Sequence, residues 1–259
     1  MNHVLTIARK EIVDGARDFR SLLASFLYAI MGPLVVGLVS LAVRGTSTSG
    51  AAVQTSMMAV FTLVSAFVGG MNVAMDTVAG ERERRSLLPL LLTAVPREAI
   101  MLGKWLAVSF FALAGLFVDL LGFAVVLALT GIHSPALSLP GLVLLALGLF
   151  SLPLLAAAMQ LLISTASHAI KEAQTYLSLI VFAPMGVGMF MVFSPAAKHA
   201  WLGYLPIVGQ QLQLEAWFSG QPIGLWQPLA LGYLTLALTF LALMAAANRL
   251  RRDEILYGN

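Results

Sequence analysis

Few residues in this sequence are charged, and most of those that could do chemistry lie in one short run. Residues 81–85 read Glu-Arg-Glu-Arg-Arg, and a Leu-rich stretch follows them as far as Pro96. Acidic and basic side chains that alternate in this way are suited to ion pairs with another protein surface. Arginines alone could serve only to fix a membrane topology, but that role explains neither Glu81 nor Glu83. We therefore interpret the run as a docking site.

Four further polar residues stand in or near apolar stretches and are candidates for a substrate path. Asp119 is the one acid inside a confident apolar span, and a charged side chain at that depth is costly unless it faces protein or water. Its role has two interpretations, a structural hydrogen bond or the binding of a cation or proton. Asn72 and Asp76 lie one helical turn apart at the end of another apolar stretch, and Glu215 lies in a later polar segment.

The sequence has no pattern typical of an enzyme or a metal site. It contains no cysteine, which excludes thiolate ligands and a Cys nucleophile. A phosphate loop of the form G-x-x-x-x-G-K-[ST] is also missing. We therefore assign no catalytic or metal-binding residue, and we expect this chain to bind no cofactor and no nucleic acid. The four histidines are scattered without metal-ligand spacing, at His3, His133, His168 and His199.

The elements that must position these residues are membrane-spanning helices. The chain has 259 residues, of which 59% are hydrophobic and 10% charged, whereas a soluble domain carries about 25% charged residues. A helix needs roughly 20 apolar residues to cross a bilayer core. Six such stretches predict an all-α polytopic membrane protein with six transmembrane helices in a single domain, residues 1–259. The stretches are 21–43, a second within 45–75 that centres on 57–75, 105–130, 139–163, 175–193 and 225–247.

The positive charges indicate how these spans are oriented. Loops rich in Lys and Arg stay on the cytoplasmic side of a membrane. Of the 15 Lys and Arg residues, only Arg44 and Lys198 fall on the other side of the predicted topology. Both termini and the charged run are therefore expected in the cytoplasm.

Three segments outside the spans have patterns of their own. Residues 1–20 are predicted to form an elbow helix on the membrane surface, because apolar residues recur on one face from residue 4 onward. Residues 195–224 are too polar to span and too apolar for a free loop, which predicts a re-entrant segment in the outer leaflet. Residues 76–104 form a long cytoplasmic loop. The predicted apolar face of the elbow helix consists of Leu5, Ala8, Ile12, Ala16 and Phe19.

The second half of the cytoplasmic loop is predicted to be a short amphipathic helix from Ser86 to Pro96. Pro89 falls near its first turn, where a missing amide hydrogen is tolerated. Such a helix would keep its Leu side against the bundle and present the preceding charges to the cytoplasm, as a coupling helix does. Its apolar positions are Leu87, Leu90, Leu91 and Ala94.

The same loop resembles the signature loop of ABC type 2 exporter permeases, in which an acidic-basic run leads to a Leu-rich helix, a Pro and a Gly-Lys. Lys171-Glu172-Ala173-Gln174, at the start of the fifth span, is similar to the sodium-export (NatB-like) branch of that family. The matching positions of the loop are Glu81, Arg82, Glu83, Arg84, Leu87, Pro89, Leu90, Leu91, Pro96, Gly103 and Lys104.

The sequence departs from the family pattern in three places. The usual Gly-Thr after the charged run is Arg85-Ser86 here, and the usual Glu after the next Leu is Leu88. The large outer insertion that members of the sodium-export branch often carry between the first two spans is absent.

The resemblance implies a non-catalytic permease subunit in a bacterial cytoplasmic (inner) membrane. It would form a homodimer and work with two copies of a separate ATPase, which binds the ATP and Mg. The implied substrate is sodium or another monovalent cation; the alternatives are a lipid, peptide or drug-like molecule and, less favoured, a secondary transporter. Contact with the ATPase is implied for Glu81, Arg82, Glu83, Arg84, Arg85, Leu87, Leu90, Leu91, Lys171 and Glu172.

Overall fold

The computed structural model of the chain describes all residues except 1, 43–47, 131–138, 195–198, 222–223 and 251–259, and the described residues fold into helices and connecting turns. Six helices are long and apolar enough to cross a membrane, which confirms the predicted number of spans. These spans are Phe19–Leu41, Ala52–Glu83, Arg97–Leu129, Leu145–Ala166, Ile170–Phe193 and Trp226–Arg249.

The elements follow one another along the chain as an unbroken series of helices. They are α1 (Asn2–Arg17), α2 (Phe19–Ala42), α3 (Thr48–Val68), α4 (Met71–Ala74), a π-helical turn η1 (Met75–Gly80), α5 (Glu81–Glu83), α6 (Leu87–Leu91), α7 (Arg97–Thr130), α8 (Leu139–Leu149), α9 (Ser151–Ala166), α10 (Ile170–Phe193), a 3-10 turn η4 (Ala200–Tyr204), α11 (Val208–Phe218) and α12 (Trp226–Arg249).

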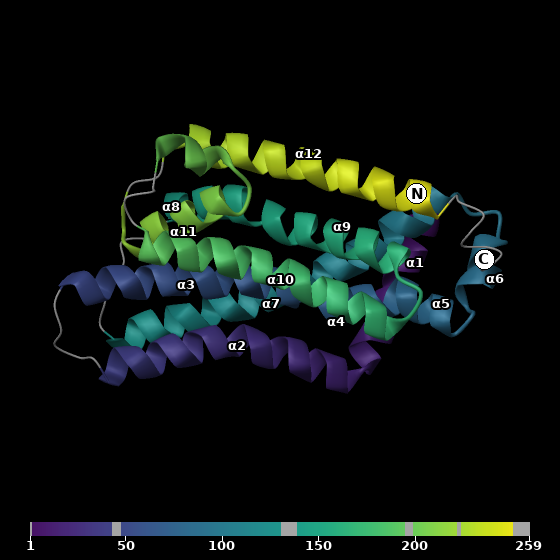
Figure 1. The fold of residues 1–259 in the computed structure, drawn as a ribbon, viewed down its shortest axis with the longest axis horizontal. Coiled ribbons are helices and arrows are strands. Elements are labelled where there is room, and N and C mark those ends of the chain that lie inside the picture. The colour runs from purple at the N-terminus through teal and green to yellow at the C-terminus, as the bar shows by residue number, and fades with distance from the viewer. Residues whose placement is uncertain (1, 43–47, 131–138, 195–198, 222–223, 251–259) are drawn as a thin grey trace.

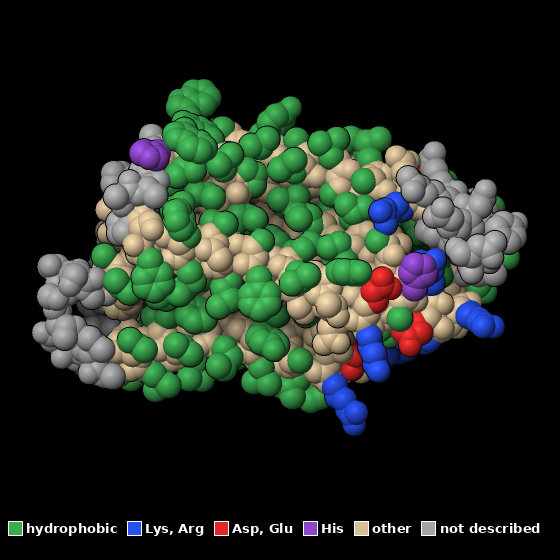
Figure 2. All heavy atoms as spheres, viewed as in Figure 1, with side chains coloured by type: hydrophobic (Ala, Val, Ile, Leu, Met, Phe, Trp, Pro, Cys, Tyr) green, Lys and Arg blue, Asp and Glu red, His purple; other side chains and the backbone are tan. Residues whose placement is uncertain are grey.

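The long helices run alongside one another, and the short ones gather at the two ends of the bundle. Figure 1 shows α1, α5 and α6 at one end, with α8 and α11 toward the other. The face drawn in Figure 2 is covered with hydrophobic side chains along most of its length, and its Lys, Arg, Asp and Glu side chains gather at the end that holds α5 and α6. The charged residues around the run 81–85 therefore occupy one end of the bundle.

The second span continues beyond the predicted limit of residue 75, because a break at Gly69 and Gly70 does not end it. A Cβ atom on Gly69 would lie 3.1 Å from Ala112 Cα, and one on Gly70 would lie 2.8 Å from the Val108 carbonyl oxygen. The two glycines thus allow close contact with α7, and the chain resumes as α4, η1 and α5. This continuation carries helical structure into the charged run.

The small residues of α7 pack as the sequence predicts. A Cβ atom on Gly115 would lie 3.0 Å from Gly69 Cα, and one on Gly122 would lie 2.6 Å from Pro33 Cγ of α2. Asp119 lies on the same face of α7 and is only 1% exposed, which confirms that its side chain points into the bundle.

Two predicted peripheral helices differ in detail from the observed ones. The helix predicted for residues 86–96 ends at Leu91 as α6, and Thr93 bonds through both its amide and its hydroxyl to the Leu90 carbonyl oxygen in a turn. Such local bonds compete with helix continuation. The segment 195–224 contains the buried helix α11, which packs between α3, α8 and α10.

The predicted apolar face of the N-terminal helix is only partly buried. Ala8 is buried, but Leu5 and Phe19 are 59% and 70% exposed. The helix is instead turned so that Ile7 meets α7 at Gly103, where a Cβ atom would lie 2.7 Å from Ile7 Cβ. This rotation also buries Glu11, which needs charged partners there.

Candidate functional site

The residues nearest the run 81–85 form a buried ring of ion pairs. Lys104 of α7 has no exposed side-chain surface, and its Nζ atom lies 2.9 Å from Glu11 Oε1 of α1 and 2.7 Å from Glu81 Oε2 of α5. It also donates to the carbonyl oxygen of Thr77 at 2.5 Å. Lys10 Nζ closes the ring at 3.2 Å from Glu11 Oε1 and 3.1 Å from Glu81 Oε1. This charge ring (Lys10, Glu11, Glu81 and Lys104) joins α1, α5 and α7.

The ring balances two cations against two carboxylates, as buried charges require. Burial alone would lower the pKa of Lys10, but the carboxylates of Glu11 and Glu81 outweigh it and raise that pKa above its ordinary value. Lys10 is therefore charged at physiological pH. Glu81 is only 7% exposed, so it faces the bundle and not the cytoplasm as the amphipathic-helix interpretation expected.

The next two residues of the run reach the beginning of α10. Arg82 Nη1 donates to the Ser167 carbonyl oxygen at 3.3 Å, and Glu83 Oε2 accepts the backbone amide of Ile170 at 2.8 Å. A carboxylate is favourable at this position because the first amides of a helix lack partners and the helix dipole is positive there. The two loops that were expected to couple the chain to an ATPase are thus in direct contact.

The remaining predicted coupling charges lie around this contact. Glu172 Oε2 accepts the amide of His168 at 2.7 Å, and Lys171 beside it is exposed. Arg84 Nη1 lies 2.8 Å from Asp76 Oδ1, with both side chains more than half exposed. We call the resulting patch the loop surface; it consists of Arg82, Glu83, Arg84, Arg85, Lys171 and Glu172.

The charged run ends in a tight turn at the position where the family usually has Gly. Arg85 has φ 57°, in the left-handed region that favours glycine. Its amide donates to the Arg82 carbonyl oxygen at 3.0 Å, and the Ser86 amide donates to the Glu81 carbonyl oxygen at 2.8 Å. These two bonds are the Schellman arrangement that ends a helix. The turn therefore keeps the family geometry with a less suitable residue.

The Leu-rich segment after the turn is partly anchored and partly free. Leu87 is buried and Leu90 is half-buried against the core formed by α7, α9 and α12. The side chain of Leu91 lies outside the described part of the structure. Leu92, just after α6, is 76% exposed. The predicted anchoring of the segment on its Leu side is thus observed for Leu87 and Leu90.

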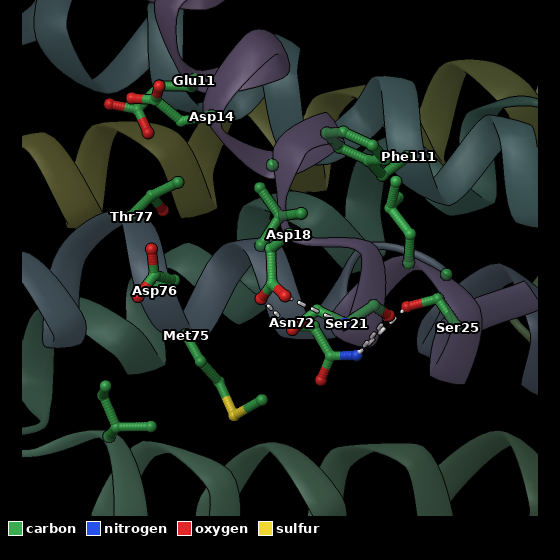
Figure 3. A pocket seen from close by; sticks show the side chains of 15 residues that line it. Glu11, Asp14, Asp18, Ser21, Ser25, Asn72, Met75, Asp76, Thr77 and Phe111 are labelled. Carbon is green, nitrogen blue, oxygen red and sulfur yellow. Dashed lines mark hydrogen bonds between the residues drawn. The ribbon is translucent and has the colours of Figure 1, made fainter.

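A cavity of about 280 Å³ lies beside the charge ring, between α1, the beginning of α2, the α4–η1 segment and the beginning of α10. Figure 3 shows Glu11, Asp14, Asp18 and Asp76 among its labelled lining residues, with Asn72 between them. Two of the predicted path residues, Asn72 and Asp76, are therefore brought together here. The acids of α1 were not predicted as part of this site.

Hydrogen bonds hold the wall of the cavity in place. Asn72 Nδ2 donates to the Ser21 carbonyl oxygen and to Ser25 Oγ, both at 3.2 Å. Asp18 accepts from the amide of Ser21 at 3.3 Å and from its hydroxyl at 2.5 Å. The hydroxyl and then the amide of Ser21 lower the pKa of Asp18. Its carboxylate thus caps α2 and remains ionised at neutral pH.

The other two predicted path residues lie away from this cavity. Within the described residues, neither carboxylate oxygen of Asp119 has a hydrogen-bond partner. Glu215 of α11 is buried, and its Oε1 atom accepts from Gln211 Nε2 at 3.2 Å. The structure therefore does not gather the four candidates into one site.

The charge ring was not predicted from the sequence, although its residues were visible there. Lys104 was read as a topology charge and as the Lys of the family's Gly-Lys, and Lys10 and Glu11 as the polar side of the elbow helix. The available signal was Lys104 at the edge of a long apolar span, where a cation needs a buried acid. No sequence feature identifies Glu11 and Glu81 as its partners.

Comparison with known proteins agrees with the resemblance. A sequence profile of the family described as "ABC-2 family transporter protein" matches residues 5–222. The chain is 36% identical over 191 residues to the "ABC transporter permease protein NatB" of Bacillus subtilis (strain 168), covering 71% of this chain and 48% of that protein. It is 32% identical over 111 residues to the "Probable ABC transporter permease protein NosY" of Stutzerimonas stutzeri, covering 40% and 38%. The chain thus spans about half the length or less of these curated relatives. The match over residues 5–222 shows that the chain belongs to the ABC-2 family of transporter proteins.

Proposed function

We propose that this chain is the permease subunit of an ATP-driven ABC exporter in a bacterial cytoplasmic membrane. Its termini and the loop surface face the cytoplasm, where two copies of a separate ATPase bind. The observation that carries the proposal is the contact of Glu83 with the Ile170 amide and of Arg82 with the Ser167 carbonyl oxygen. Through it, the charged residues of both loops form one continuous docking surface.

The charge ring supports a mechanical role for this surface. A push of the ATPase on α5 and α6 reaches α10 through Glu83 and reaches α1 and α7 through Glu81, which contacts Lys104. Rigid ion pairs transmit such a displacement because buried partners cannot separate without a large cost. The helices then move together between inward-facing and outward-facing states.

A second copy of the chain completes the proposed transporter. The apolar stretches of α2 and α10 are only 28% buried within one copy, so each offers a long side to another helix or to lipid. A homodimer formed along these helices places the acidic cavities of both copies near the common axis, because the beginnings of α2 and α10 line each cavity.

Sodium or another monovalent cation is the substrate that the cavity favours. Its walls bring the carboxylates of Glu11, Asp14, Asp18 and Asp76 to one space, and oxygen ligands suit hard cations. Asp119 would serve as a second ion position deeper in the bundle. A lipid, peptide or drug-like molecule is the alternative, favoured by the apolar surroundings of Asp119 in the core of α3, α7 and α11.

Co-purification followed by flux measurement tests this function. The tagged chain is isolated from its native membrane, and the proposal expects a separate ATPase to be retained with it. Vesicles that contain both proteins are then assayed for ATP-driven movement of sodium, of fluorescent lipid and of a cationic dye. Transport by the chain in vesicles without an ATPase would contradict the exporter assignment, and movement of lipid or dye without sodium would replace the substrate.

A further inference from the structure

One face of the N-terminal helix carries arginines that have no task in the proposed transport cycle. Arg9 and Arg17 of α1 and Arg20 at the beginning of α2 are all exposed. In the described part of the chain, no carboxylate lies within 4 Å of the guanidinium of any of them. Exposed apolar residues lie between them. We call this the basic face; it consists of Leu5, Arg9, Val13, Arg17, Phe19 and Arg20.

The acidic residues of the same helix point elsewhere, so the basic face keeps its positive charge. Glu11 is buried in the charge ring, and Asp14 lies 3.5 Å from Lys10 Nζ. Asp14 and Asp18 line the cavity, as Figure 3 shows. The residues of the basic face in α1 recur at positions 5, 9, 13 and 17, a spacing that places them on one side of a helix. Acids and bases of this segment are thus separated onto different sides.

The exposed apolar residues fix the depth of this face relative to the bilayer. Phe19, Leu23 and Leu27 are 70%, 47% and 55% exposed and follow one another along one side of α2, the first membrane span. That stripe continues upward into the hydrocarbon region. Phe19 therefore marks the boundary between hydrocarbon and headgroups, and Arg17 and Arg20 beside it lie at the level of lipid phosphates.

We propose that the basic face binds the headgroups of anionic phospholipids in the adjacent leaflet. Arginine guanidinium groups bind phosphate oxygens with paired hydrogen bonds, and the intervening Leu5, Val13 and Phe19 enter the acyl boundary. Each arginine near an anionic surface contributes about fivefold in affinity at moderate salt, so three contribute roughly a hundredfold. This site would hold α1 at the membrane surface while the ATPase pushes on α5.

The test measures lipid preference in the full-length chain. Purified protein in a neutral detergent is equilibrated with equal amounts of phosphatidylglycerol and phosphatidylcholine that have the same acyl chains, and the retained lipids are counted by native mass spectrometry. The wild type is expected to retain phosphatidylglycerol in preference, less so as salt is raised. The triple variant Arg9→Gln, Arg17→Gln, Arg20→Gln is expected to lose roughly a hundredfold of this preference.

Two further variants separate site binding from net charge and from folding defects. Arg85→Gln, Lys171→Gln, Arg249→Gln removes the same charge from exposed positions at the same end of the bundle and is expected to keep the preference. Replacing the three arginines of the basic face with Lys keeps the charge and is expected to keep most of the preference. The proposal is overturned if the wild type has no preference, if both Gln variants lose it equally, or if the Gln variant of the basic face keeps it while losing the ATPase.

Discussion

Removal of Lys104 alone should be among the most destabilising single changes in this chain. Its Nζ atom attracts two carboxylates at 2.7 and 2.9 Å, about 6 kcal/mol each at an effective dielectric constant of about 20. Desolvation of the three ions offsets most of that attraction. Lys104→Met leaves Glu11 and Glu81 side by side without their shared cation, which should cost about 3–5 kcal/mol. The unfolding midpoint should fall by roughly 10 °C.

Unfolding is followed by tryptophan fluorescence and circular dichroism in detergent, for the wild type and matched variants. The triple variant Lys104→Met, Glu11→Gln, Glu81→Gln removes all three buried charges and should recover most of the lost stability. Arg84→Gln breaks the exposed pair with Asp76 and should cost less than about 1 kcal/mol. Equal losses for Lys104→Met and Arg84→Gln, or a triple variant less stable than Lys104→Met, would refute the buried ring.

Three other changes test separate parts of the structure. Asp18→Ala should cost about 1 kcal/mol as a lost helix cap; because Ser21 lowers the pKa of Asp18, this stabilisation is present above the unfolded-state pKa of about 3.9 and disappears as the pH falls through the lower native value, so the advantage over Asp18→Ala in a pH series of melts should vanish in acid. Arg85→Gly should raise stability by about 0.5–1 kcal/mol because the residue has φ 57°, whereas Arg84→Gly, at φ −78°, should lower it; equal effects would argue against the turn. Asp119→Asn should fold normally and lose sodium export in vesicles, and wild-type export would show that Asp119 is not a required ion site.

The number and order of the spans could be predicted because each is an uninterrupted apolar stretch of the length a bilayer requires. The details that failed depend on contacts between helices. Gly69 and Gly70 look like a helix end, but they allow close approach to α7 and the span continues. The rotation of α1 depends on the space that Gly103 leaves for Ile7, which no pattern within residues 1–20 contains.

The candidate site was predictable where charges cluster in sequence and not where they cluster only in space. The run 81–85 and the pair Lys171 and Glu172 were identified, and the structure brings their loops together at Ile170. Glu81 was placed on the wrong side of its helix, since its partner Lys104 is 23 residues away. Asp119 and Glu215 were grouped with Asn72 by polarity alone, and the structure separates them.

The central claim is that the loop surface receives the motion of an ATPase. The decisive measurement is ATP-driven sodium flux in vesicles that contain the chain and its ATPase, with Glu83→Arg, Arg84→Glu compared to Arg249→Glu, an exposed charge reversal at the same end of the bundle. The account predicts that the double reversal inserts and folds normally but uncouples ATP hydrolysis from flux, while Arg249→Glu transports as the wild type does. Unchanged ATP-dependent export by the double reversal would contradict it.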